Sequence, residues 1–237
     1  MDDVNMEAEM TALPPVVDRA TWQNDLDELR IREKAATREL DAIAAQRRRM
    51  PVVKLPEYRL TAEDGSELSL AEVFDGRSQL IVYNHMWTDG NEWQCPGCTG
   101  FTSQFTRLDA LDAWDARFVI VSNGPIDELV AYKRRVGNRM TWYSCAGSSF
   151  GTEVGAAPGG GFALNTFLRD GDDVYHSWQT FSRGIEQVSP LFGLLDTLPY
   201  GRQEVWQDSP DGWPQSATYS KWASSKQIAD LYGEKPR

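Results

Sequence analysis

The chain has 237 residues, 41% of them hydrophobic and 11% aromatic, so it can bury a substantial core without a disulfide framework. Its 24 basic and 35 acidic residues give a formal net charge of −11, which repels nucleic-acid phosphates and anionic membrane surfaces. The sequence lacks a secretory signal pattern, and no apolar stretch approaches the roughly 18 residues of a membrane span. We therefore expect a cytoplasmic protein that binds neither nucleic acid nor membrane.

The N-terminal part of the chain divides into a tail and a helix. Residues 1–17 mix Asp, Glu, Met and Pro without a period, which predicts a mobile tail. Beyond Asp18, apolar residues recur at steps of mostly three and four, and they are Trp22, Leu26, Leu29, Ala36, Leu40, Ile43 and Ala44. This spacing predicts one amphipathic helix to about Arg49, ended by Pro51, and hence a helical extension over residues 18–50.

Residues 51–207 carry the pattern of one α/β domain. A short hairpin is expected around Asp64-Gly65, and QLIVYNHMW, from Gln79, is apolar on both faces as a buried strand should be. Apolar spacing then predicts a helix of about 18 residues from Pro96 to Trp114. RFVIVSNG predicts the next buried strand, PIDELVAYKRRVG the next helix, and MTWYSCAGSS a third strand. Alternating strands and helices in this order imply parallel strands joined by right-handed crossovers.

The rest of this domain changes character. FALNTFLRDGDDVYHSWQTF alternates around Asp170-Gly171 and predicts an antiparallel hairpin, which a helix over residues 186–198 follows. Parallel strand-helix-strand units followed by a hairpin are the layout of a thioredoxin-like fold, with a central mixed sheet between helices. Residues 208–237 predict a largely irregular arm whose aromatic residues pack on the core or on a partner subunit.

The C-x-x-C motif of Cys95 and Cys98 falls between a predicted buried strand and a predicted helix. A thiol attacks only as its thiolate, and the N-terminal end of a helix stabilises that anion. Pro96 suits a first helical position, and Cys98 lies one turn later, close enough to form a disulfide with Cys95. The motif therefore predicts a redox pair in which Cys95 attacks and Cys98 resolves.

Two other interpretations of the motif stay open: an inert pair of thiols, or a pair that binds a metal such as copper or zinc together with a histidine. Only His85, His176 and Cys145 remain as further ligands, and no second C-x-x-C is present. For these three residues a structural role is the simpler expectation: a strand end for His85, a hydrogen-bonded histidine for His176 and a small buried side chain for Cys145.

Several segments in the same order resemble the DUF899 family of thioredoxin-like bacterial proteins. They include FDGRSQLIVYNHMW, CPGCTGF, FVIVSNGPIDELVAYKRRVG, WYSCAGSSF, FLRDGDDVYHSW and LLDTLPYGRQE, and with the long N-terminal helix they span about residues 18–205. The resemblance implies a thioredoxin-like fold related to peroxiredoxins, with Cys95 and Cys98 at the redox positions.

Three functional hypotheses follow from the sequence. The first is a thiol-disulfide oxidoreductase that needs no cofactor and acts on a protein or small-molecule disulfide or on a peroxide. The second is a copper- or zinc-binding protein on the same fold. The third is a non-catalytic interaction protein in which the helix at 18–49 and the tryptophan-rich C-terminal arm form a homodimer.

Overall fold

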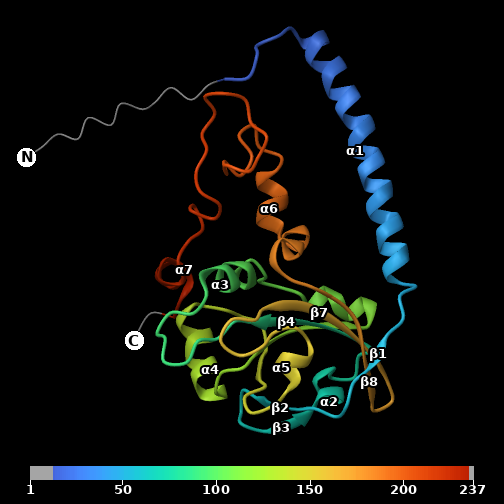
Figure 1. Ribbon diagram of the computed structural model, residues 1–237, viewed down its shortest axis with the longest axis vertical. Coiled ribbons are helices and arrows are strands. Elements are labelled where there is room, and N and C mark those ends of the chain that lie inside the picture. The colour runs from blue at the N-terminus through green and yellow to red at the C-terminus, as the bar shows by residue number, and fades with distance from the viewer. Residues whose placement is uncertain (1–12, 235–237) are drawn as a thin grey trace, which may run out of the picture. The chain divides into compact units, whose positions relative to one another are not determined.

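The computed structural model describes residues 13–234, so most of the tail predicted at 1–17 lies outside the described residues. The described residues form two compact units (Figure 1), one containing residues 13–49 together with Leu194–Lys221, and the other containing Met50–Gly193 and residues 222–234. Within the described part of the chain, no helix combines the length and the apolar character needed to cross a membrane.

The larger unit contains one eight-stranded mixed sheet. Its strand order is β1-β8-β7-β4-β5-β6-β2-β3, in which β4, β5 and β6 are parallel neighbours and β7 runs antiparallel to both β4 and β8. The strands are β1 (Val53–Lys54), β2 (Arg59–Ala62), β3 (Glu67–Ser69), β4 (Gln79–His85), β5 (Ala116–Ser122), β6 (Trp142–Ser144), β7 (Ala163–Asp170) and β8 (Asp173–Thr180). The predicted parallel strands and both predicted hairpins are confirmed.

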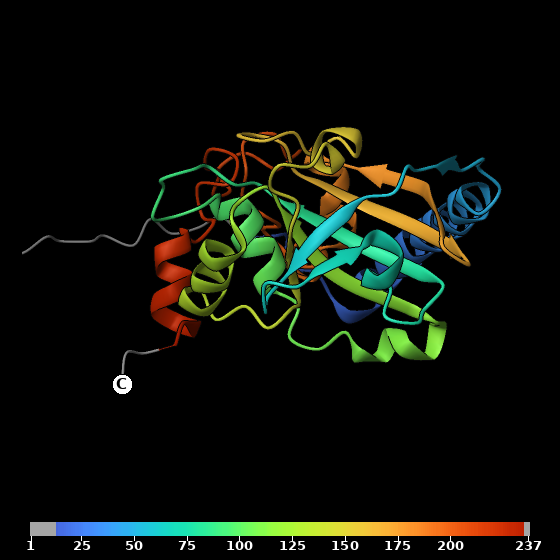
Figure 2. The same ribbon diagram turned by 90° about the horizontal axis from the view of Figure 1, so that it is seen from below.

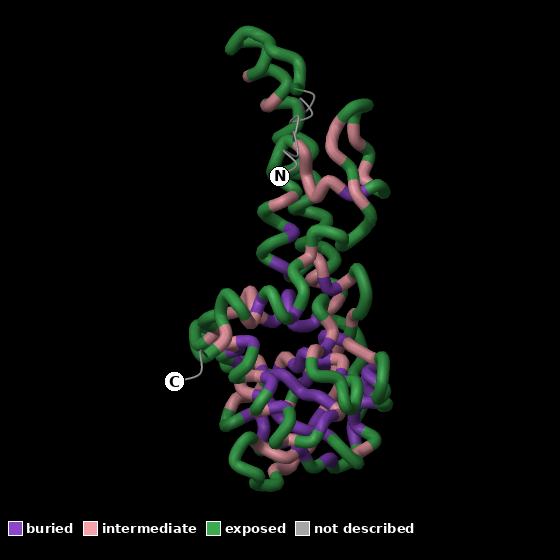
Figure 3. The backbone as a smooth tube through the Cα atoms, turned by 90° about the vertical axis from the view of Figure 1, so that its left-hand side faces the viewer, coloured by how far each residue is buried: buried purple, intermediate pink, exposed green. Residues whose placement is uncertain are grey.

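Helices cover both faces of this sheet, because its central strands are apolar on both sides. On one face, Tyr83 of β4 and Ile120 of β5 pack with α3 (Pro96–Ser103) and α4 (Ile126–Arg135). On the other, Val82 and Val119 pack with α2 (Leu70–Val73) and α5 (Phe150–Glu153). Figure 3 shows most of the buried segments gathered in this unit. A parallel strand-helix-strand unit joined to an antiparallel hairpin, with helices on both faces, is the thioredoxin-like fold that the sequence predicts.

The chain after β8 returns to the helices of the first face. It forms the 3-10 helix η2 (Ser182–Val188) and α6 (Pro190–Leu195), and the segment predicted as an irregular arm contains α7 (Ser225–Tyr232). A capping box starts α7, in which the Ser224 hydroxyl accepts from the backbone N–H of Gln227 and the Gln227 side chain accepts from that of Ser224. Figure 2 shows α7 beside α3 and α4.

Two predicted helices are shorter than the sequence indicates. The expected helix from Pro96 to Trp114 is wrong, because α3 ends at Ser103 and a separate 3-10 helix, η1 (Asp109–Trp114), follows. At the break, Gln104 Oε1 accepts hydrogen bonds from Ser189 Oγ and from Leu191 N, each at 2.9 Å. The helix expected over 186–198 is interrupted at Ser189, whose extended backbone fits the restriction that Pro190 imposes on its predecessor.

In the smaller unit, the predicted long helix is confirmed as α1 (Arg19–Arg47). The Asp18 carboxylate caps it by accepting from Ala20 N at 2.8 Å and Thr21 N at 2.9 Å. These bonds lower the pKa of Asp18, the largest contribution coming from the Thr21 N–H. No residue of α1 is buried, although its sequence carries an apolar stripe.

Candidate active site

Cys95 is the N-cap residue of α3, and Pro96 occupies the first helical position. Its Sγ lies 3.5 Å from the backbone nitrogen of Cys98, which donates to it. The pKa of Cys95 is lowered to about 6, first by a hydrogen bond from the Cys98 thiol and then by the backbone N–H groups of Cys98 and Gly97, against the opposing effect of partial burial. The predicted placement at a helix start is therefore confirmed, and it favours the thiolate at neutral pH.

Cys98 has the opposite environment. It lies on the inner side of α3 and is only 1% exposed. Its pKa is raised well above the usual range, first by its hydrogen bond to Cys95, then by burial and by the charge of Cys95. All three cysteines are free thiols. The motif thus pairs a partly exposed anion with a buried thiol that donates to it.

Tyr83 is the residue of the sheet whose side chain contacts the buried thiol of Cys98. It lies in β4, is 1% exposed, and its ring packs on Phe101 of α3 with 4.8 Å between centroids. Its hydroxyl is hydrogen-bonded to the Cys98 thiol, and the pKa of Tyr83 is raised well above its usual range, mainly by burial. The tyrosine is therefore protonated at neutral pH, and its hydroxyl is a polar neighbour of the buried thiol.

The loop before Cys95 is held by the side chain of Gln94, which is 3% exposed. Its Oε1 accepts from Thr88 N at 2.8 Å, and its Nε2 donates to the carbonyls of Thr88 at 3.1 Å and Asn91 at 3.0 Å. From α4, Arg135 donates to the carbonyl of Glu92 at 2.7 Å. These bonds fix the segment that delivers Cys95 from the end of β4 to the start of α3.

A chain of hydroxyl groups supports the first turn of α3 from behind. Thr99 Oγ1 donates to the carbonyl of Cys95 at 2.9 Å and lies 2.7 Å from the hydroxyl of Tyr132. Ser225 of α7 donates from its Oγ to the carbonyl of Gln94 at 2.8 Å and lies 3.2 Å from Thr99 Oγ1. The C-terminal helix is therefore joined directly to the carbonyl of Gln94 and, through Thr99, to the carbonyl of Cys95.

Trp222 packs against α3 just before α7 begins. Its indole Nε1 donates to the carbonyl of Pro96 at 2.8 Å, and its ring stacks on Phe192 with 5.2 Å between centroids. The close approach requires a glycine at position 100, because a Cβ there would lie 2.2 Å from the indole nitrogen. The expectation that aromatic residues of the arm pack on the core is confirmed for Trp222.

Among the described residues, no hydrogen bond joins the other predicted candidates to Cys95 or Cys98, although the ring of His85 packs against those of Tyr83 and Tyr132. His85 is buried at the end of β4, its Nδ1 lies 2.8 Å from the carbonyl of Met86, and burial lowers its pKa to about 4. His176 Nε2 lies 2.8 Å from Asn165 Oδ1. Burial raises the pKa of Cys145 to about 11. Among residues 13–234, no three or more His, Cys, Asp or Glu side chains are grouped so that they could hold a metal ion.

Four supporting residues are not revealed by the sequence patterns: Tyr83, Gln94, Tyr132 and Ser225. Tyr83 and Gln94 lie close to the motif in sequence, but nothing in their spacing indicates a polar role. Ser225 is 126 residues from Thr99. The capping-box pattern of Ser224 and Gln227 is the one signal that could have revealed the helix that carries Ser225.

The sheet topology and the cysteine pair at the start of its first crossover helix define a thioredoxin-like protein. The sequence profile of the family described as "Bacterial protein of unknown function (DUF899)" matches residues 11–227. The chain therefore belongs to the DUF899 family. A search of curated proteins gives no match.

Solved structures with a related chain path include proteins of the peroxiredoxin type. Peroxidoxin BcpB from Mycobacterium tuberculosis is 18% identical, with 58% of this chain and 90% of that chain covered and a TM-score of 0.40. The bacterioferritin comigratory protein of Xanthomonas campestris is 17% identical, with coverages of 57% and 88% and a TM-score of 0.38. A peroxiredoxin-like protein from Aquifex aeolicus is 14% identical, with coverages of 55% and 74% and a TM-score of 0.38.

Proposed function

We propose that this protein is a thiol-disulfide oxidoreductase in which Cys95 attacks and Cys98 resolves. The observation that carries the proposal is the division of the pair into a thiolate with a pKa of about 6 and a buried thiol whose pKa is raised. Perturbed and opposed pKa values at neighbouring groups are typical of sites that perform nucleophilic chemistry. The substrate class is a protein or small-molecule disulfide.

The reaction has two exchange steps. The Cys95 thiolate attacks one sulfur of the substrate disulfide, forming a mixed disulfide and releasing the other substrate sulfur as a thiolate. Cys98 then gives its proton to the substrate thiolate released first, attacks Cys95 Sγ and releases the second substrate sulfur as a thiolate. Two electrons pass from the cysteine pair to the substrate, and the pair is left as the Cys95–Cys98 disulfide. A thiol reductant outside the protein returns it to the dithiol state.

The local environment supports the second step. Once Cys95 has become part of a mixed disulfide, its negative charge is gone, and with it the charge that raises the pKa of Cys98. The Tyr83 hydroxyl then remains as the hydrogen-bond partner that stabilises a Cys98 thiolate. Formation of the mixed disulfide thus activates the resolving cysteine.

Turnover of a disulfide substrate with dithiothreitol as reductant tests the proposal. Cys95→Ser should abolish turnover, because a hydroxyl with an ordinary pKa is not a nucleophile at neutral pH. Incubated with the disulfide substrate without dithiothreitol, Cys98→Ser should leave a trapped mixed disulfide that mass spectrometry detects on Cys95. Cys145→Ser is the matched control and should retain turnover.

The same preparation distinguishes the metal-binding hypothesis. A redox pair is alkylated equally fast with and without a chelator, whereas a metal-bound pair is protected until the chelator removes the metal. Protection that only a chelator releases, or full turnover in Cys95→Ser, would overturn the proposal.

A further inference from the structure

Helix α1 carries a coiled-coil seam, and none of its residues is buried. Spacings of four, three, four, three, four and three residues separate Trp22, Leu26, Leu29, Glu33, Ala36, Leu40 and Ile43. Strict alternation of four and three is the heptad pattern whose apolar positions face a partner helix in a coiled coil. Yet Leu29 is 47% exposed and Leu40 is 59% exposed, and no residue of α1 is buried.

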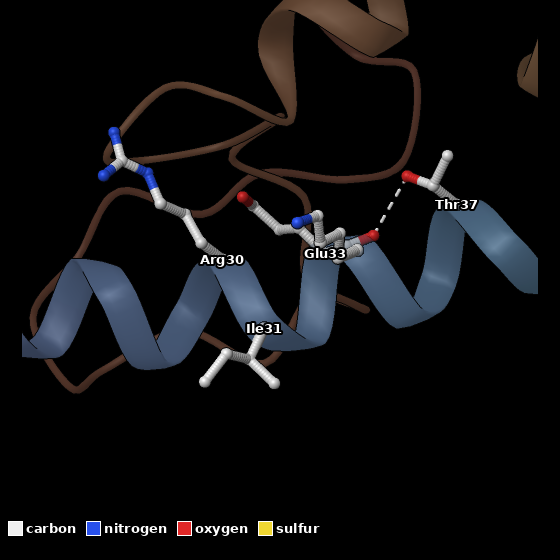
Figure 4. A pocket seen from close by; sticks show the side chains of 5 residues that line it. Arg30, Ile31, Glu33 and Thr37 are labelled. Carbon is white, nitrogen blue, oxygen red and sulfur yellow. Dashed lines mark hydrogen bonds between the residues drawn. The ribbon is translucent and has the colours of Figure 1, made fainter.

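The seam has one polar member, Glu33, at its centre. Figure 4 shows Glu33 on the same side of α1 as Arg30 and Thr37, with Ile31 pointing away on the opposite side. Thr37 Oγ1 donates to the carbonyl of Glu33 at 3.0 Å, so this hydroxyl is engaged by the helix itself. A partner for the seam must therefore accept an apolar stripe with a carboxylate in the middle.

The charges of α1 decide which orientation of a second copy fits. A parallel pair would place the two Glu33 carboxylates opposite each other in the seam, and it would gather Arg47, Arg48 and Arg49 of both copies at one end. An antiparallel pair avoids both contacts. It brings Asp25, Asp27 and Glu28 of each helix toward the basic end of the other.

Charge also selects the register of an antiparallel pair. The register that places Leu26 opposite Ile43 and Leu29 opposite Leu40 of the other copy sets each Glu33 against the small Ala36. In this register the flanking positions bring Arg32 of each copy to Glu39 of the other. Shifting one helix by a heptad in either direction would instead oppose Arg32 to Arg32 or Glu39 to Glu39. Only the first register therefore pairs opposite charges along the seam.

We propose that α1 pairs with α1 of a second copy of this chain as an antiparallel coiled coil, in which Arg32 of each copy faces Glu39 of the other. Flanking charges set orientation and partner choice in coiled coils, and here they match only in this arrangement. The proposal concerns the smaller unit alone and does not depend on the thiol chemistry of Cys95.

Charge reversal in the full-length protein tests this pairing. Arg32→Glu or Glu39→Arg alone replaces two attractive contacts per dimer with two repulsive ones, and each should weaken dimerisation by about tenfold or more in sedimentation equilibrium. The double variant Arg32→Glu/Glu39→Arg restores both contacts with their signs exchanged and should return the dimer affinity to near the starting value.

Lys34→Glu is the matched control, since it makes the same change of charge on α1 away from the seam and its flanks. It should leave the affinity nearly unchanged, and circular dichroism confirms that α1 remains helical in each variant. A protein that stays monomeric over the accessible concentration range would overturn the proposal. So would a dimer that is indifferent to Arg32→Glu, as expected of a parallel pair, or one that the double variant fails to restore.

Discussion

Two cysteines follow strands that flank β5 in the same sheet, and the pKa values of their thiols differ strongly. Cys95 follows β4 and caps a helix, where N–H groups and the Cys98 thiol donate to its sulfur, and its pKa falls to about 6. Cys145 directly follows β6, and its Sγ lies 3.4 Å from the carbonyl of Ser122 and 3.3 Å from Asn123 Oδ1. Burial dominates there, and its pKa rises to about 11.

The difference shows that the carboxyl edge of parallel strands does not by itself make a thiol reactive. Both cysteines lie near that edge, but at Cys95 the hydrogen-bond donors outweigh partial burial, whereas at Cys145, which is 1% exposed, burial outweighs the backbone N–H groups of Cys145 and Gly151. Hydrogen-bond donors stabilise a sulfur as an anion, and burial away from water stabilises it as a thiol. The helix start after β4, rather than the sheet, accounts for the candidate chemistry.

The largest expected effect is the difference between these two thiols in alkylation rate. At pH 7 the thiolate fractions implied by pKa values of about 6 and about 11 differ by a factor of roughly 10⁴. The more acidic thiol is intrinsically less nucleophilic, which reduces the expected difference in rate by a factor of about 100. Cys95 should therefore react with iodoacetamide at least about 100-fold faster than Cys145, as peptide mass spectrometry can measure. The alkylation rate of Cys95 should rise with pH up to a little above its pKa of about 6 and then level off.

Comparable rates for the two cysteines in the folded protein would contradict this contrast. The control is the unfolded chain in denaturant, where both thiols lose their surroundings and should react at similar rates. Cys98 serves as an internal reference, because its raised pKa predicts slow alkylation although it is only three residues from Cys95.

A second test asks whether α3 depends on the C-terminal segment that packs against it. Gly100→Ala places a Cβ 2.2 Å from the Trp222 indole nitrogen, so the indole must move and its hydrogen bond to Pro96 is lost. Gly97→Ala, in the same helix, meets only Cys95 Sγ at 3.7 Å, an ordinary contact. We expect Gly97→Ala to be neutral or stabilising by up to about 1 kcal/mol and Gly100→Ala to be destabilising by about 1–2 kcal/mol in urea unfolding.

Equal free energies of unfolding for these two variants would show that Trp222 is free to move aside. Tryptophan fluorescence of the native state provides an independent readout, since only Gly100→Ala should change the environment of an indole.

The sequence predicted the elements that local patterns determine. The apolar pattern predicts the buried strands around the motif, and the turn residues predict the hairpin at Asp170-Gly171. A proline at the first helical position predicts the helix start at Cys95. The length of α3 did not follow, because Phe105 and Leu108 continue a helical period while Gln104 is drawn into hydrogen bonds with partners 85 and 87 residues away in sequence.

The same reason explains what was missed at the site. Gln94, Tyr132 and Ser225 act through contacts with backbone carbonyls and hydroxyl groups that only the folded chain brings together. A single sequence shows the two cysteines, because their spacing is local, and it does not show the residues that hold them in place.

The smallest of the expected effects concerns the contribution of Cys98 to its neighbour. The largest single cause of the low pKa of Cys95 is the hydrogen bond from the Cys98 thiol. Cys98→Ala removes this donor and leaves the backbone N–H groups, so the pKa of Cys95 should rise by about one unit, toward the ordinary thiol value of about 8.5. Cys98→Ser keeps a donor of similar size and should preserve most of the depression. Thiolate absorbance followed against pH measures both variants, and identical curves would assign the low pKa to the helix start alone.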